Sequence, residues 1–244
     1  MLKRLLVVAL VLAVSAPLSA QEKKKRAFKP DIPGFFLVDF GFNSGFNRPQ
    51  YFTTGFWGSR TLNLYYHYPV RIGNSKFSYN PGAGFAFERF KLTNNYTLPQ
   101  QANPSDNYFD LVNANQLNAF FTTANFKKSM LISNYFDIMP LEFRFDTNPK
   151  DVSRSFSFSV GGRVGILMEA HTKIKYIDNG LNGTYKDKQL HGLNQFRYSA
   201  YTRIGLGNFN LFGFYNLSPL FSANKGPAAT TMNTMTIGIS LNGL

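Results

Sequence analysis

Apolar and polar residues alternate along residues 155–176 of this chain. The even positions from Phe156 to Met168 are mostly apolar, whereas the odd positions from Ser155 to Lys175 are mostly polar or glycine. A period of two is typical of a β-strand with one apolar and one polar face. The stretch is longer than the roughly five or six residues of an ordinary soluble strand. It predicts a membrane-spanning strand with lipid on one side and a polar lumen on the other.

Seven further segments show the same alternation, namely residues 35–43, 61–72, 76–92, 129–145, 195–206, 209–219 and 234–242. The segment over residues 129–145 is the least regular, because Phe136 belongs to one apolar phase and Leu141 to the opposite one. A β-bulge near Met139 and Pro140 would reconcile the two phases, since proline lacks the donor for the strand ladder.

The number of strands and the lengths of their connections predict the fold and its orientation. Bacterial single-chain barrels have an even number of strands. The connections after the second, fourth and sixth predicted strands are short, and the others are long. Short turns are periplasmic and long loops extracellular in such barrels. The sequence therefore predicts an all-β fold, an eight-stranded antiparallel up-and-down transmembrane β-barrel over residues 34–244, with both mature termini in the periplasm.

The first 20 residues have the features of a secretory signal peptide. Lys3 and Arg4 precede an apolar run over residues 5–14, and small residues follow up to Ala20. This run is too short for a transmembrane helix, which needs roughly 20 residues. We expect cleavage after Ala20, with Ala16 as the alternative, and hence export to the bacterial outer membrane.

Composition narrows the class of protein. The chain has no cysteine, which leaves no disulfide framework and no thiolate metal site. Hydrophobic residues make up only 44%, and no later apolar run approaches the length of a spanning helix, which argues against a helical membrane protein. The 26 Phe and 13 Tyr suit the outer wall and interfacial girdles of a barrel.

The chain is strongly basic, with a formal net charge of +13. Part of the excess lies in residues 22–29, within a predicted periplasmic tail over residues 21–33. We expect no nucleic-acid partner, because an exported chain meets little nucleic acid. Attraction to anionic lipid headgroups or lipopolysaccharide phosphates is one interpretation of the cluster. A solvated tail is the other.

Charged residues also fall on the predicted inner faces of the strands. An eight-stranded barrel is only wide enough for its own inward side chains. Buried charges are costly unless they are paired, so these residues should form a structural network that fills the lumen. A narrow pore for ions or small solutes is the alternative. The predicted lumen network consists of Asp39, His67, Arg71, Glu88, Arg163, Glu169, Arg197 and Arg203.

Little in the chain indicates catalysis. An outer-membrane enzyme acting on lipid A or on proteins needs a serine, a histidine and an acid near the outer rim. The histidines are His67, His171 and His191, and spacing marks no serine as their partner. We expect a protein without catalytic, cofactor-binding or metal residues, and keep an enzyme acting on lipid A as the less favoured alternative.

Two regions are candidates for surface interactions. Residues 155–176 would extend about 70 Å, which exceeds a hydrocarbon layer of about 25 Å even when the strand is tilted. The excess places His171, Lys173 and Lys175 at the outer rim, where lipopolysaccharide or a partner could meet them. Residues 93–128 form a long loop rich in Asn, Gln and aromatics, which suits a sugar or protein partner; extension of the next strand is the alternative. We expect a monomeric barrel.

Four stretches together resemble a known family. They read SYNPGAGF over residues 78–85, HTKIKY over 171–176, LNQFRY over 193–198 and LSPLF over 217–221. This set resembles the small outer-membrane β-barrel proteins of Bacteroidota, often labelled PorT-like, across nearly all of the mature chain. Some PorT-like members serve a protein secretion system, so the resemblance implies an accessory role there, although most members have no assigned function. The chain departs from many outer-membrane barrels by ending on Leu244 rather than on an aromatic residue.

Overall fold

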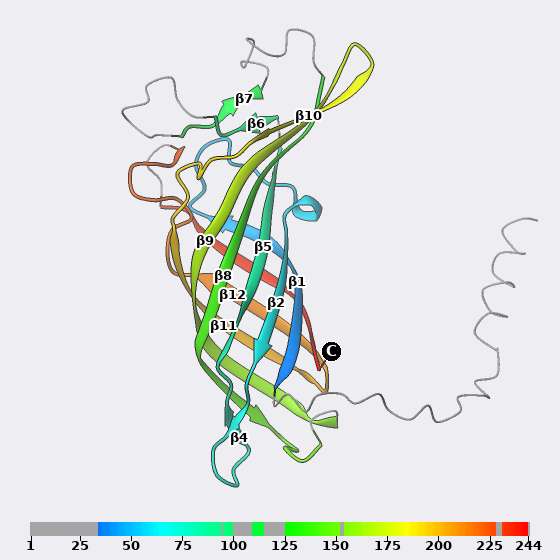
Figure 1. The fold of residues 1–244 in the computed structure, drawn as a ribbon, viewed down its shortest axis with the longest axis vertical. Coiled ribbons are helices and arrows are strands. Elements are labelled where there is room, and N and C mark those ends of the chain that lie inside the picture. Colours follow the sequence, from blue (N-terminus) through cyan, green and yellow to red (C-terminus); the bar gives the residue numbers. More distant parts are fainter. Residues whose placement is uncertain are drawn as a thin grey trace, which may run out of the picture. The chain divides into compact units, whose positions relative to one another are not determined.

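The computed structural model describes residues 34–93, 95–99, 109–114, 125–151, 154–227 and 231–243 (Figure 1). The expected signal peptide over residues 1–20 and basic tail over residues 21–33 lie outside these ranges. Within the described part of the chain, no helix is long and apolar enough to cross a membrane.

Eight strands form a closed antiparallel barrel, which confirms the predicted fold class. In the barrel wall, each strand named below is hydrogen-bonded to the next one in the chain, and β8 pairs with β9. The ring also closes the ends of the chain, because β1 pairs with β13. The strands are β1 (Phe35–Phe46), β2 (Arg60–His67), β5 (Gly82–Leu92), β8 (Asn125–Asp146), β9 (Phe156–Asp178), β11 (Phe196–Leu206), β12 (Phe209–Asn216) and β13 (Asn233–Asn242).

The alternation in the sequence separates the two faces of the barrel wall. In the first half of β9, Ser157, Ser159 and Arg163 are buried, whereas Phe158 and Val160 between them are 41% and 44% exposed. A soluble barrel places its polar face outside and its apolar face inside. Here the arrangement is reversed, with polar residues inside and apolar residues outside.

Two predicted strands are interrupted near one end of the barrel. The segment over residues 61–72 breaks after β2, and its remainder is β3 (Val70–Arg71). The segment over residues 76–92 is divided into β4 (Phe77–Tyr79) and β5. Proline lies at both breaks, and its missing N–H group interrupts the ladder. The pair β3–β4 forms a hairpin that joins β8 beyond the barrel wall.

The long pair β8–β9 contains three register shifts. One lies between Ile138 and Leu141, which confirms the bulge predicted near Pro140. Another lies between Asn134 and Tyr135, which pair with Glu169 and Leu167, so Met168 is an extra residue that forms a bulge in β9. At that point Leu167 and Ala170 are both buried, so the two residues between them share the outer face. The prediction of a single phase throughout residues 155–176 was therefore wrong.

The sequence did not predict three short strands in the long connections. β10 (Leu181–Asp187) folds back on β9 through Asn179 and Gly180, whose φ values of 47° and 80° are those of a type I′ hairpin turn. A separate pair is formed by β6 (Tyr96–Thr97) and β7 (Val112–Asn113). On β9 the pairing with β11 ends at Ile166, and beyond that point β10 replaces β11 as its neighbour.

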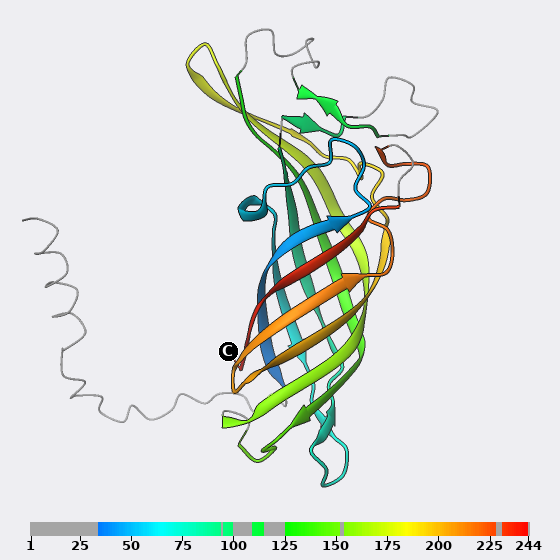
Figure 2. The same cartoon turned by 180° about the vertical axis from the view of Figure 1, so that it is seen from behind.

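The short and long connections gather at opposite ends of the barrel (Figures 1 and 2). The end with the β3–β4 hairpin is called the short-turn end, and the other is called the long-loop end. At the short-turn end the N–H group of Gly243 donates to the carbonyl of Phe36 at 2.9 Å, so both ends of the barrel segment meet there.

Candidate functional site

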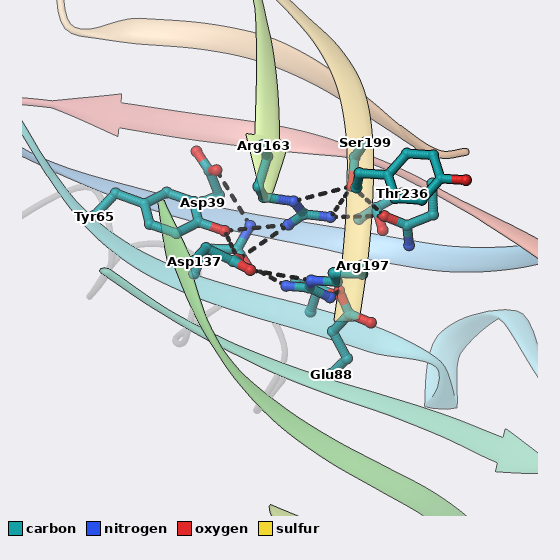
Figure 3. Close-up of polar contacts among 12 residues, drawn as sticks. Asp39, Tyr65, Glu88, Asp137, Arg163, Arg197, Ser199 and Thr236 are labelled. Carbon is teal, nitrogen blue, oxygen red and sulfur yellow. Dashed lines mark hydrogen bonds and ion pairs between the residues drawn. The ribbon is translucent and has the colours of Figure 1, made fainter. Parts of the chain in front are cut away.

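The centre of the lumen is occupied by an ion-pair network (Figure 3). Arg197 on β11 donates to Asp137 on β8 through Nε to Oδ1 at 3.0 Å and through Nη2 to Oδ2 at 2.7 Å. Its Nη1 atom also donates to Glu88 on β5 at 2.5 Å. The two-pronged contact fits the planar guanidinium to the carboxylate and fixes both side chains. Space for it comes from Gly165 on β9, where an added Cβ would lie 2.1 Å from Asp137 Oδ1.

A second arginine extends the network toward the opposite wall. Arg163 on β9 is fully buried, and its Nη1 atom lies 3.4 Å from Asp137 Oδ2. Its other nitrogens donate to Ser199 at 3.1–3.2 Å and to Asn216 on β12 at 2.9 Å. Tyr65 on β2 donates to Asp137 at 2.7 Å. Side chains from five strands, β2, β8, β9, β11 and β12, therefore meet at the Asp137 carboxylate and the Arg163 guanidinium beside it.

A third arginine makes a separate bridge nearer the short-turn end. Arg203 on β11 donates to Asp39 on β1 and to Glu142 on β8, each at 3.0 Å. Tyr201 also donates to Glu142, at 2.7 Å, and the Nδ1 atom of His67 lies 3.7 Å from the same carboxylate. Each of these groups is at least nine-tenths buried, as buried charges require partners.

Aromatic rings fill the space that the ion pairs leave. The Arg197 guanidinium carbon lies 3.7 Å from the ring centroid of Tyr135. The corresponding carbon of Arg163 lies 4.3 Å from the ring centroid of Phe214. These are favourable cation–π arrangements. The pocket beside Arg197 and Glu88 retains about 10 Å³, which is near the minimum for one water molecule.

The long connections close the other end of the lumen with an apolar cap. All four supply buried side chains to one cluster, which packs on the inner faces of β5, β8 and β9. The cap residues from the connections are Phe52, Leu98, Phe109, Leu111, Leu193, Leu220, Phe221 and Met232. Two aromatics of residues 93–128 serve this packing, because Phe109 is buried in the cluster and Tyr96 is partly buried against it.

His191 joins three segments of the cap and is fully buried. Its Nδ1 atom donates to the carbonyl of Leu98 at 2.8 Å, and its Nε2 atom accepts from the N–H group of Thr172 at 3.1 Å. Its ring also meets Phe109 edge to face at 5.3 Å between centroids. Its Nε2 atom also lies 3.0 Å from the carbonyl oxygen of Asp187, so all three polar neighbours of the ring are backbone groups, which indicates a structural role.

The lumen contains most of the predicted network, with two exceptions. Arg71 lies on the exposed β3–β4 hairpin and donates to the carbonyl of Pro149 in a neighbouring turn. Glu169 lies on the outer face because of the bulge in β9, and it pairs there with His171 at 3.3 Å. The network contains the other predicted residues, Asp39, His67, Glu88, Arg163, Arg197 and Arg203.

Sequence reasoning missed two carboxylates that organise the lumen. Asp137 accepts from both Arg163 and Arg197, and Glu142 accepts from Arg203. The signal was present in the sequence, because Asp137 lies between outward Phe136 and Ile138, and the bulge returns Glu142 to the inner face. Among the described residues, no group of three His, Cys, Asp or Glu side chains is placed to hold a metal ion.

No protein-family model and no curated protein matches the sequence. Among solved structures, Ail, the attachment invasion locus protein of Yersinia pestis, is 14% identical with a TM-score of 0.35, over 86% of this chain and 99% of Ail. Neisserial surface protein A (NspA) is 9% identical with a TM-score of 0.37, over 86% of this chain and 96% of NspA. These values are too low to carry an argument about function.

Proposed function

We propose that this chain is an integral outer-membrane β-barrel protein with a closed lumen and a structural or surface-interaction role. One observation carries the proposal. Apolar side chains cover the outer surface of every barrel strand, and charged side chains form ion pairs inside the barrel. All eight strands contribute exposed apolar side chains, for example Phe40, Leu64, Phe85, Ile138, Val164, Ile204, Leu211 and Ile239. Water would penalise so large a continuous apolar surface, whereas lipid would cover it.

The height of the apolar belt matches a bilayer. On β9 the exposed apolar residues run from Phe156 to Met168, which is 12 residue steps. At about 3.3 Å per residue this is about 40 Å along the strand, and a tilt near 45° reduces it to about 28 Å. The hydrocarbon band of outer-membrane barrels is about 25 Å tall. The short-turn end would then face the periplasm and the long-loop end the exterior.

The lumen is filled by side chains of the barrel wall, which favours a closed barrel over a pore. Three arginines and four carboxylates cross-link the wall near the centre, and the apolar cap covers the long-loop end. The contacts of the three histidines, with carboxylates and backbone groups, support structural roles for them. His67 approaches Glu142, His171 pairs with Glu169, and His191 holds backbone groups. We therefore propose that the protein acts without catalysis and contacts outer-membrane lipid and lipopolysaccharide.

Single-cysteine labelling tests the location and the orientation, because the chain has no cysteine of its own. Lys186→Cys at the long-loop end should react with a membrane-impermeant maleimide on whole cells. Lys150→Cys, exposed at the short-turn end, should react only after the outer membrane is disrupted. Labelling of both positions on intact cells would contradict the proposed orientation. Absence of the protein from the outer-membrane fraction would contradict the proposed location. A secretion-system role and a protein partner at the long loops remain proposals from the family resemblance and the loop composition.

A further inference from the structure

One side of the barrel is basic directly above the apolar belt. On the outer face of β5, Phe85 and Phe87 are followed by Arg89 and Lys91 in the same phase. The buried residues between them, Glu88 and Phe90, point into the barrel, so the two cations point outward. On β2 the outward series Leu64 and Leu62 likewise ends at Arg60.

The two longest strands continue this change from apolar to basic. On β9 the bulge places Lys173 and Lys175 outward, because Thr172 and Ile174 beside them are buried. On β8 the outward position opposite Lys175 is Lys128. The hairpin strand β10 adds Lys186 opposite Lys173. The basic face is defined by Arg60, Arg89, Lys91, Lys128, Lys173, Lys175 and Lys186, and strands β5, β8 and β9 lie side by side there (Figure 1).

Like charges lie directly opposite one another on this face. Arg60 pairs in register with Arg89, Lys128 with Lys175, and Lys173 with Lys186. Cross-strand partners have Cβ atoms about 4.5–5.5 Å apart, and like charges at such positions are destabilising. Partial burial lowers the pKa of the Lys128 ammonium group, and repulsion from Arg89, Lys91, Lys175 and Arg60 lowers it further. The carboxylate of Glu169, at the edge of this face nearest the belt, is already engaged with His171 and Asn134.

Exposed aromatics at the same level mark an interface. The short helix η1 (Phe56–Gly58) lies beside the basic face, because Arg60 donates to the carbonyl of Trp57 at 2.7 Å. Trp57 is 75% exposed and Phe56 is 60% exposed. Phe56 stacks on Phe42 at 4.6 Å between ring centroids, which links it to the apolar belt on β1. Tryptophan at the top of an apolar band is typical of the headgroup level of a membrane.

We propose that the basic face binds the phosphate groups of an anionic glycolipid in the outer leaflet, with its acyl chains on the belt below. This inference rests on the proposed membrane location. Phosphate oxygens would accept hydrogen bonds from the arginines and lysines and would offset the repulsion among them. The lipid's acyl chains would lie against Phe85, Phe87, Leu62 and Leu64, which continue the same strands downward. A soluble acidic partner would gain nothing from that apolar continuation.

Lipid binding by the folded protein tests the inference. Detergent-solubilised protein is titrated with bis-phosphorylated lipid A and, in a second arm, with fully dephosphorylated lipid A of the same acylation. The variant carries Arg89→Gln, Lys128→Gln and Lys175→Gln. A matched control removes three cations at the short-turn end, through Lys76→Gln, Lys150→Gln and Arg154→Gln. We expect the first variant to bind bis-phosphorylated lipid A at least about tenfold more weakly than wild type, and the control to stay within about twofold.

Three outcomes would overturn the inference. They are equal wild-type binding of the two lipid A forms, an equal loss in both triple variants, and tighter binding of heparin that lipid A does not displace. The first comparison needs no variant, so it stands even if a substitution impairs folding. Insertion into zwitterionic phosphatidylcholine vesicles is measured in parallel by heat-modifiable gel mobility. Failure to insert would contradict the proposed function, whereas insertion without phosphate-dependent binding would contradict this inference alone.

Discussion

Arg197 on β11 and Asp137 on β8 form a two-pronged ion pair across the lumen, with nitrogen–oxygen distances of 3.0 and 2.7 Å. The two residues are separated by 60 positions in the sequence and by strand β9 in the barrel wall. Their contact therefore crosses the inner face of β9, over Gly165, where an added Cβ would lie 2.1 Å from Asp137 Oδ1. It makes the lumen a packed core of charged groups, in which each member depends on its partner.

Replacing Arg197 with Ala should destabilise the barrel strongly. Removal of the guanidinium leaves Asp137 and Glu88 buried without their main partner, which costs roughly 3–5 kcal/mol of unfolding free energy. The measurement is urea unfolding of the protein inserted in lipid vesicles. Arg154→Ala is the control, since that side chain is 87% exposed and its loss should change stability by less than about 0.5 kcal/mol. Similar stabilities for the two variants would contradict the network.

The bulge in β9 makes a deletion at Met168 tolerable. Removing Met168 leaves Leu167 inward, Glu169 outward and Ala170 inward, so all other side chains keep their faces. Deletion of Val164 should instead prevent folding, because Ile166 would take the place of Gly165, where even a Cβ would lie 2.1 Å from Asp137 Oδ1. Heat-modifiable gel mobility after refolding reports both results. Equal behaviour of the two deletions would show that the bulge does not set the phase.

Substitution of His191 should loosen the cap without unfolding the barrel. His191→Asn removes the ring while keeping a residue that tolerates the positive φ of 48° at this position. The N–H group of Thr172 and the carbonyl of Leu98 then lose their partner, which costs roughly 1–3 kcal/mol locally. Limited trypsin digestion should cleave the long-loop end at least about tenfold faster than in wild type. His171→Asn is the matched control and should digest at the wild-type rate; a faster control, or an unchanged His191 variant, would refute the role.

A charge in the middle of the apolar belt should cost more than one at its edge. Val164→Arg places a guanidinium near the centre of the bilayer, which costs about 2–4 kcal/mol in outer-membrane barrels. Phe156→Arg, at the short-turn edge of the belt on the same strand, should cost about 0–1 kcal/mol. Unfolding of vesicle-inserted variants measures both changes. Equal costs at the two depths would contradict the proposed position of the membrane.

Much of this architecture could be predicted from local patterns. The period of two gave all eight barrel strands, because lipid and lumen impose opposite polarity on neighbouring residues. Pro140 indicated a bulge, and inward Arg163, Arg197 and Arg203 required partners. Asn179 and Gly180 also carried the signal of a hairpin turn, although the prediction treated them as loop.

Other features depend on the tertiary structure and left no local signal. The bulge at Met168 lies among residues that are ordinary in strands, so the change of face that moved Glu169 outward could not be predicted from its neighbours. The cap brings together Phe52, Leu98, Leu193 and Phe221 from four separate connections, and only the closed barrel makes them neighbours. The basic face likewise depends on the register of five strands.

Ionic conductance in a planar lipid bilayer tests the central claim most directly. Purified protein whose insertion has been verified should produce no steady single-channel conductance, because the arginine–carboxylate network fills the centre of the lumen and the apolar cap covers its outer end. Steady, reproducible single-channel steps from the wild-type protein would contradict the closed lumen and would establish the narrow pore in its place.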